Sequence, residues 1–205
     1  MRPFSLLIKP TGPDCNIACK YCFYSGKTYL FGDDSHRMND EVLSKMTHDY
    51  LALKLPASSF VWQGGEPTLM GLDFYRKAIE LQKQYGNDGQ IISNALQTNA
   101  ILLDKDWCKF LNEYKFLVGI SLDGPQKYHD FYRVGKFGLG RSIRPNMAVC
   151  RMSEYGRTSI FASSMALRRC TRWARLEKIL MEIGYPSIAV LVSKPPVMIF
   201  SGLIG

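Results

Sequence analysis

Two kinds of apolar segment alternate strictly along the first 125 residues of the chain. Four short runs have the composition of strands, and each ends at polar residues, glycine or proline. These runs are 4–9, 58–63, 90–99 and 115–122. Three longer segments carry apolar residues at helical spacing, and they are 39–55, 71–86 and 104–114. This alternation predicts an α/β fold with parallel strands and crossover helices, as a barrel or a doubly wound sheet.

The helix predicted at 39–55 begins with an Asn/Asp-rich stretch. Val42, Met46, Leu53 and neighbouring apolar residues recur behind that start at helical spacing, which indicates a helix. We also expect Cys108, inside the predicted helix 104–114, to be a small buried hydrophobic residue, and His48 to lie on a helix surface.

Polar, glycine-bearing segments follow each of the four predicted strands. They are the cysteine-rich segment after 4–9, then "GGEPT", "QTN" and "SLDGP". In parallel α/β folds the carboxyl ends of the strands form the active site. We therefore expect these four segments to converge on one face of the protein.

Three of the six cysteines lie within "CNIACKYC", at Cys15, Cys19 and Cys22. Thiolates with this C-x3-C-x2-C spacing can reach three corners of one small metal centre. Zinc would need a fourth ligand, and the nearest candidate is the distant His36. A [4Fe–4S] cluster normally takes four thiolates, so three would leave one iron open for catalysis. Three incidental cysteines are the remaining alternative.

The composition is ordinary for a globular domain of 205 residues, and no apolar run approaches the roughly 20 residues of a membrane span. The five-residue apolar run near the start is too short for a signal peptide, so we expect a cytoplasmic protein without a membrane partner. Clustered cysteines in that reducing compartment favour metal binding or catalysis over disulfides.

The formal net charge of +8 is unevenly distributed. Residues 1–140 carry 16 Lys and Arg against 15 Asp and Glu, whereas 141–205 carry 10 against 3. A phosphate-binding patch is one interpretation of the basic end. The other is an abrupt change in the character of the sequence, with no function attached.

Four stretches together resemble the anaerobic sulfatase-maturating enzymes of the radical S-adenosylmethionine (SAM) superfamily. They are "LLIKPTGPDCNIACKYCFY", "QGGEPTLMGLDFY", "LQTNAILLDKDWCKFL" and "FLVGISLDGPQKYHDFYR". The likeness runs from about residue 3 to 138. It implies a partial parallel (βα)6-type radical SAM barrel, incomplete in this chain, with its cluster- and SAM-binding core in residues 1–140.

The same resemblance implies the two cofactors and the residues that hold them. Cys15, Cys19 and Cys22 would bind three irons of a [4Fe–4S] cluster, and SAM would chelate the fourth iron. The residues implied to contact or line the SAM site are Tyr21, Gly64, Gly65, Glu66, Gln97, Asn99, Ser121 and Arg133. Within that set Glu66 would pair with the SAM ammonium group. Outside it, the place of His129 in "YHDFYR" suggests local scaffolding around Arg133.

The implied reaction is reductive cleavage of SAM and oxidation of a Cys or Ser of a sulfatase to formylglycine. The implied partners are a sulfatase polypeptide and an electron donor such as flavodoxin or ferredoxin, without nucleic acid. The alternatives are a radical SAM maturase of another peptide and an inactive fragment. A non-catalytic zinc or nucleic-acid-binding module is a further alternative, from another class.

The resemblance weakens after about residue 140. No Asp follows Asp130, so the family's aspartate base has no counterpart and the catalytic residue is unassigned. We expect 141–205 to be a degraded or out-of-frame continuation of the same domain, without the C-terminal auxiliary-cluster domain. A helix at 171–184 and a strand at 187–192 are the exceptions. Resequencing the coding DNA from several isolates tests whether this region is in the correct reading frame.

Overall fold

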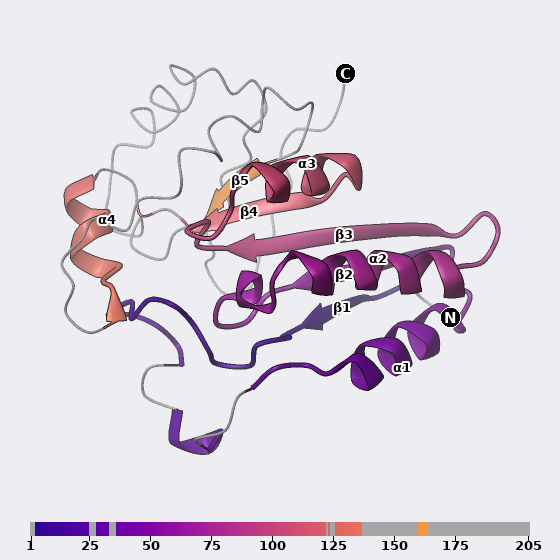
Figure 1. Cartoon of the computed structure of the whole chain (residues 1–205), viewed down its shortest axis with the longest axis horizontal. Helices are drawn as coiled ribbons and strands as arrows, with labels where there is room; N and C mark the ends of the chain where they lie inside the picture. Colours follow the sequence, from indigo (N-terminus) through magenta and orange to yellow (C-terminus); the bar gives the residue numbers. More distant parts are fainter. Residues whose placement is uncertain are drawn as a thin grey trace. The chain divides into compact units, whose positions relative to one another are not determined.

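The computed structural model describes residues 3–24, 28–32, 36–121, 123, 126–136 and 160–163 (Figure 1). The chain divides into two compact units. The first comprises Met1–Asn16 and Phe23–Gln97, and the second comprises Ile17–Cys22 and Thr98–Gly205. The boundary falls inside the cysteine segment, so Cys15 belongs to the first unit, and Cys19 and Cys22 to the second.

The first unit is a parallel sheet with two helices. Its elements are β1 (Ser5–Ile8), η1 (Thr28–Leu30), α1 (Asp40–Leu51), β2 (Ala57–Trp62), η2 (Pro67–Met70), α2 (Leu72–Tyr85) and β3 (Ile91–Thr98). Strand β2 is central, pairing in parallel with β1 on one side and β3 on the other. The second unit contains α3 (Lys105–Glu113), β4 (Leu117–Ser121), α4 (Gln126–Tyr132) and β5 (Ile160–Ser163), with β4 parallel to β5. The predicted parallel α/β fold is confirmed.

The core of the first unit forms where β2 meets α2. Alternate residues of β2 are buried, and Phe60 stacks on Trp62 at 6.2 Å between ring centroids. The rings of Phe74 and Tyr75 from α2 lie edge-on to Trp62, at 5.9 and 5.5 Å. Aromatic side chains of this size bury large apolar areas, and these geometries are the ones that rings prefer. Helix α2 is thereby fixed against one face of the sheet.

A buried polar network connects the same elements. The side-chain oxygen of Asn94, on β3, accepts hydrogen bonds from Trp62 Nε1 (2.9 Å) and Gln82 Nε2 (3.0 Å). Asn94 Nδ2 in turn donates to Gln82 Oε1 (2.8 Å). Gln82 and Asn94 are 4% and 7% exposed. Buried amides need such partners, so the network specifies how α2, β2 and β3 pack.

Helix α1 begins where predicted. Asn39 caps it by accepting from Val42 N, as the Asn/Asp-rich start suggested. Val42 and Leu53, two of the apolar residues at helical spacing, are 49% and 42% exposed. The buried residues of the helix are Leu43, Thr47, Tyr50 and Leu51.

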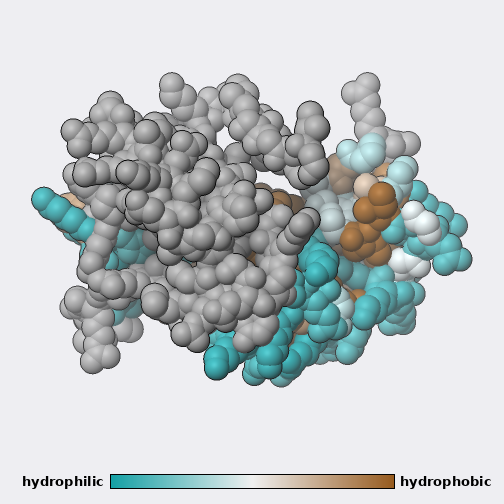
Figure 2. Space-filling model, turned by 90° about the horizontal axis from the view of Figure 1, so that it is seen from above, coloured by the Kyte–Doolittle hydropathy of each residue, from teal (hydrophilic) through white to brown (hydrophobic). Residues whose placement is uncertain are grey.

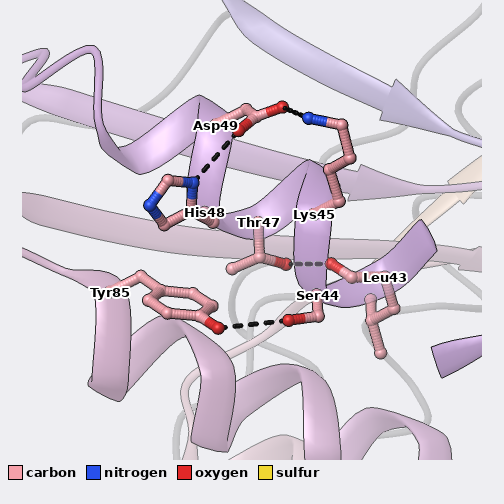
Figure 3. Close-up of polar contacts among 7 residues, drawn as sticks. All are labelled: Leu43, Ser44, Lys45, Thr47, His48, Asp49 and Tyr85. Carbon is pink, nitrogen blue, oxygen red and sulfur yellow. Dashed lines mark hydrogen bonds and ion pairs between the residues drawn. The ribbon is translucent and has the colours of Figure 1, made fainter. Parts of the chain in front are cut away.

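A polar residue can occupy the buried face of α1 because its hydroxyl is satisfied locally. Thr47 Oγ1 donates to the Leu43 carbonyl at 2.8 Å (Figure 3). Ser44 of α1 and the Tyr85 hydroxyl of α2 lie 3.1 Å apart and share a hydrogen bond. His48 and Lys45 face Asp49 at the surface, which confirms the surface position of His48.

The second unit contains two elements that sequence patterns did not predict. Helix α4 is only seven residues long, too short to show a helical period. Strand β5 has four residues and lies in a stretch that we expected to be aberrant. The helix and strand predicted at 171–184 and 187–192 lie outside the described residues.

Cys108 confirms its predicted role as a buried residue of α3, with 1% of its surface exposed. Burial raises the pKa of its thiol to about 11. At pH 8 about 0.1% of such a thiol is ionised, and only the thiolate reacts readily. We expect Cys108 to resist iodoacetamide at pH 8 until denaturant is added, whereas the partly exposed Cys19 reacts in the folded chain. Peptide mass spectrometry of both cysteines checks this, and equal labelling would contradict it.

Several large hydrophobic side chains remain exposed in the described part of the chain. Ile91, Phe23 and Tyr29 are 67%, 65% and 78% exposed. In Figure 2 the described surface is largely hydrophilic, with a hydrophobic area towards the right of the view.

Among the described residues, no helix combines the length and apolar character needed to cross a bilayer.

Candidate functional site

In the second unit, the cysteine segment pairs with the chain that leaves α4. Ala18 N donates to Val134 O (2.8 Å) and Lys20 N donates to Tyr132 O (2.9 Å). Ile17 and Gly135 form an antiparallel bridge beside them. A turn with a hydrogen bond from Cys22 N to Cys19 O (3.0 Å) follows. Backbone pairing therefore fixes the segment that carries Cys19, and both Cys19 and Cys22 are partly exposed.

In the first unit, the Gly-Gly-Glu segment packs backbone to backbone against the residues that precede Cys15. Gly65 N donates to Gly12 O (2.9 Å) and Glu66 N donates to Asp14 O (2.7 Å). A Cβ atom at Gly65 would lie 1.9 Å from the Asp14 carbonyl oxygen. Gly64 has φ +135°, a conformation open to glycine alone. These glycines are thus required by contact with the chain's own backbone.

Glu66 is 1% exposed, and one of its oxygens has a local role. Its Oε1 accepts from Thr68 N (3.1 Å) and from the Thr68 hydroxyl (2.5 Å), which caps η2. The pairing of Glu66 with a SAM ammonium group stays a prediction.

Asp14, next to Cys15, is held by two basic side chains. His36 Nδ1 lies 3.0 Å from Asp14 Oδ1, and Arg37 Nη1 donates to Oδ2 at 2.7 Å. Burial alone would raise the pKa of Asp14, but the hydrogen bonds with His36 and the charge of Arg37 outweigh it and lower the pKa. His36, considered above as a zinc ligand, instead contacts Asp14 and the Phe31 carbonyl.

Two polar side chains of the second unit bind the Asp123 carboxylate, and one of them also contacts Cys19. Arg133 donates through Nε to Oδ2 (3.1 Å) and through Nη2 to Oδ1 (3.3 Å). The Tyr21 hydroxyl donates to Oδ2 at 2.5 Å. Arg133 Nη1 lies 3.9 Å from Cys19 Sγ. An aspartate that was not predicted therefore binds two predicted cofactor residues, Tyr21 and Arg133. Arg133 in turn contacts the predicted iron ligand Cys19.

Tyr21 lies between aromatic and charged neighbours. Its ring is 5.8 Å from that of Tyr132, and the Arg133 guanidinium carbon is 5.6 Å from its centroid. Burial, together with the hydrogen bond to Asp123, raises the pKa of Tyr21 well above its usual value, although the charge of Arg133 opposes this. The phenol is therefore a neutral hydrogen-bond donor at physiological pH.

The remaining predicted residues occupy strand ends. Ser121 is the last residue of β4 and Gln97 lies near the end of β3, both partly exposed. Asn99 is 6% exposed, and its side-chain oxygen accepts from Ile101 N at 3.1 Å, in a local turn. His129 accepts from Asp123 N through Nδ1 (3.3 Å) and so supports the aspartate that binds Arg133.

Three thiolates are the type of ligand that an iron–sulfur cluster takes. Among the described residues, no three His, Cys, Asp or Glu side chains gather closely enough to hold one metal ion. A four-iron cube spreads its thiolates over different irons, so it does not need that convergence. The Thr11 hydroxyl, four residues before Cys15, is buried without a hydrogen-bond partner among the described residues. A bound polar group could satisfy it.

Comparison with known proteins identifies the family. Residues 10–144, more than half of the chain, match the radical SAM superfamily, and the chain belongs to that superfamily. A [4Fe–4S] cluster and SAM are the cofactors characteristic of its members.

The chain is also similar to individual sulfatase-maturating enzymes. It is 40% identical over 157 residues to the serine-type anaerobic sulfatase-maturating enzyme of Bacteroides thetaiotaomicron, an alignment covering 76% of this chain and 38% of that enzyme. It is 46% identical over 156 residues to the cysteine-type enzyme of Clostridium perfringens, covering 76% of this chain and 42% of that enzyme. The predicted resemblance is confirmed, and the chain spans about two fifths of the length of these relatives.

A solved structure shows the same similarity in three dimensions. It is described as native anSMEcpe with bound AdoMet and Cp18Cys peptide. The TM-score is 0.77 at 36% sequence identity, and the match covers 93% of this chain and 51% of that chain. This likeness supports the α/β radical SAM fold predicted from the motifs.

Proposed function

We propose that this chain is the cofactor-binding portion of a radical SAM enzyme that oxidises a Cys or Ser of a sulfatase to formylglycine. The observation that carries the proposal is that Tyr21 and Arg133 both bind Asp123, while Arg133 also contacts Cys19 Sγ. Similarity to serine-type and cysteine-type enzymes supports the sulfatase substrate without choosing between the two side chains.

The predicted residues bind different parts of the two cofactors in this proposal. Cys15, Cys19 and Cys22 hold three irons of a [4Fe–4S] cluster, which leaves the fourth iron to SAM. When bound, the reduced cluster supplies the electron for cleavage of SAM, the chemically difficult step. Arg133 and Ser121 contact SAM, and the Tyr21 ring approaches its adenine. The Gly64–Gly65 backbone holds the segment before Cys15 in place.

The partners and the compartment belong to the same proposal. A sulfatase polypeptide is the substrate, and a reducing carrier such as flavodoxin or ferredoxin supplies electrons in the cytoplasm. The aspartate base expected from the resemblance has no counterpart after Asp130.

Anaerobic reconstitution tests the cofactor part of the proposal. We expect the 205-residue chain to take up about four irons and turn brown. Cys19→Ala should lose the cluster, because only two ligands remain, whereas the matched Cys108→Ala should keep it. Iron and sulfide analysis with the absorption spectrum measures this. A colourless zinc protein, or full iron uptake by Cys19→Ala, would refute the assignment.

An assay for 5′-deoxyadenosine, with and without a sulfatase peptide, tests the reaction. Formation of 5′-deoxyadenosine together with formylglycine supports the full activity. Cleavage of SAM without modification of a Cys or Ser peptide would support cofactor binding by this chain. It would overturn the proposal that this chain forms formylglycine. Salt-sensitive retention on DNA that is lost on truncation at residue 140 would favour the nucleic-acid-binding alternative.

A further inference from the structure

The carboxylate of Asp123 is unusual in being completely buried within the described part of the chain. Its side chain is 0% exposed, and that of its ion-pair partner Arg133 is 9% exposed. A buried carboxylate is costly unless it is paired and hydrogen-bonded. Arg133, Tyr21 and, through the backbone, His129 all bind Asp123. Two partners on the carboxylate and a third on the backbone N–H indicate a fixed arrangement.

The two hydrogen bonds from Arg133 fix the orientation of its guanidinium plane. Nε and Nη2 form the edge that faces the two oxygens of Asp123. Such a two-point contact holds a planar group more rigidly than one bond can. The Nη1 edge is left to face Cys19 Sγ, at 3.9 Å.

Tyr21 contacts the guanidinium group of Arg133 as well as its partner Asp123. The Tyr21 hydroxyl binds the same Asp123 oxygen as Arg133 Nε, and the Tyr21 ring lies 5.6 Å from the guanidinium carbon. A cation above an aromatic ring is favourable in itself. Arg133 is thus held by Asp123 on one edge and by Tyr21 on a face.

We propose that Asp123 is a positioning residue that directs the Arg133 cation at the sulfur of Cys19. The inference rests on the proposed function, because it requires an iron–sulfur cluster on that sulfur. An N–H donor and a positive charge beside a ligating sulfur stabilise the reduced, more negative cluster. Asp123 thereby sets the reduction potential through Arg133, in addition to any contact of Arg133 with SAM.

A double-mutant cycle on the midpoint potential, measured without SAM by spectroscopically monitored redox titration, tests this. Arg133→Gln should make the potential more negative, because a cation and a donor are lost. Asp123→Asn has two opposing effects, since it removes a negative charge but also releases Arg133. In the Arg133→Gln background only the charge effect remains, so Asp123→Asn should raise the potential more there than in the wild-type chain.

The controls separate positioning from general electrostatics and from misfolding. Asp130→Asn removes a charge from α4, the helix between Asp123 and Arg133 in the sequence, and should shift the potential equally in both backgrounds. Arg133→Lys keeps the charge but not the two-point contact, and should also lower the potential. Additive effects of Asp123→Asn and Arg133→Gln, or an unchanged potential in Arg133→Lys, would overturn the inference. A wild-type chain that takes up no iron would instead refute the proposed function. If Asp123→Asn fails to fold by circular dichroism, the Arg133→Lys result decides.

Discussion

Gly65→Ala should destabilise the first unit by about 3–5 kcal/mol, among the largest effects of any single substitution in this chain. The added methyl group would lie 1.9 Å from the Asp14 carbonyl oxygen, and backbone atoms cannot move aside as a flexible side chain can. Relief of the clash would break the hydrogen bonds from Gly65 N and Glu66 N. Urea unfolding followed by circular dichroism measures the free energy. The same variant should fail to take up iron, because this contact holds the residues before Cys15.

Gly89→Ala is the control for this substitution. Gly89 has φ +76°, but apart from its own residue and its two chain neighbours no atom of the described residues lies within 4 Å of the position of an added Cβ. Alanine there costs only the left-handed backbone conformation, about 1–2 kcal/mol. A similar loss of stability in the two variants would show that close packing at Gly65 is not the reason for the glycine.

Gln82→Ala should lower the free energy of unfolding by about 2–3 kcal/mol, because it leaves the buried amide nitrogen of Asn94 without its acceptor. Gln82 exchanges two hydrogen bonds with Asn94, at 3.0 and 2.8 Å. After the substitution Asn94 Nδ2 loses its acceptor at a site with little access to water. Urea unfolding again measures the change, and hydrogen exchange of the β3 amides should rise in parallel.

The same helix supplies a matched control two residues further on. Gln84 is exposed on α2, so Gln84→Ala should change stability by less than about 0.5 kcal/mol. If the two alanine variants have equal stability, the buried network does not contribute to the packing of α2 on the sheet.

Elements with a long, regular pattern were predicted almost to the residue. The strand expected at 58–63 is β2 (Ala57–Trp62), and the helix expected at 71–86 is α2 (Leu72–Tyr85). Such elements carry their own signal, since period and composition are properties of consecutive residues. The four-residue β5 carries too few residues for a period, and its pairing partner β4 is distant in the sequence.

The buried face of α1 shows that hydropathy alone does not predict which residues of a helix are buried. Val42 and Leu53 are apolar yet exposed, whereas Thr47 is polar and 1% exposed. The Thr47 hydroxyl is satisfied by the Leu43 carbonyl within the helix, so burial costs little. Hydropathy alone ranks these residues in the opposite order.

At the candidate site, the chemistry could be predicted but the supporting contacts could not. The Cys15, Cys19 and Cys22 spacing and the Gly-Gly-Glu segment indicate the radical SAM superfamily, and comparison confirms it. Asp123 was overlooked, although its place directly after a predicted strand was a usable signal. Nothing in the local sequence says that it binds Arg133, ten residues later, or Tyr21, 102 residues earlier.

The amino-acid order alone thus indicates the parallel α/β class and the residue types of an iron–sulfur and SAM site, because periodicity and cysteine spacing are local. The reason for Gly65 and the direction of the Arg133 guanidinium are different. They depend on the Asp14 carbonyl and the Asp123 carboxylate respectively. Folding brings these groups within a few ångströms of their partners, and at that range steric exclusion and hydrogen-bond direction decide what each residue does.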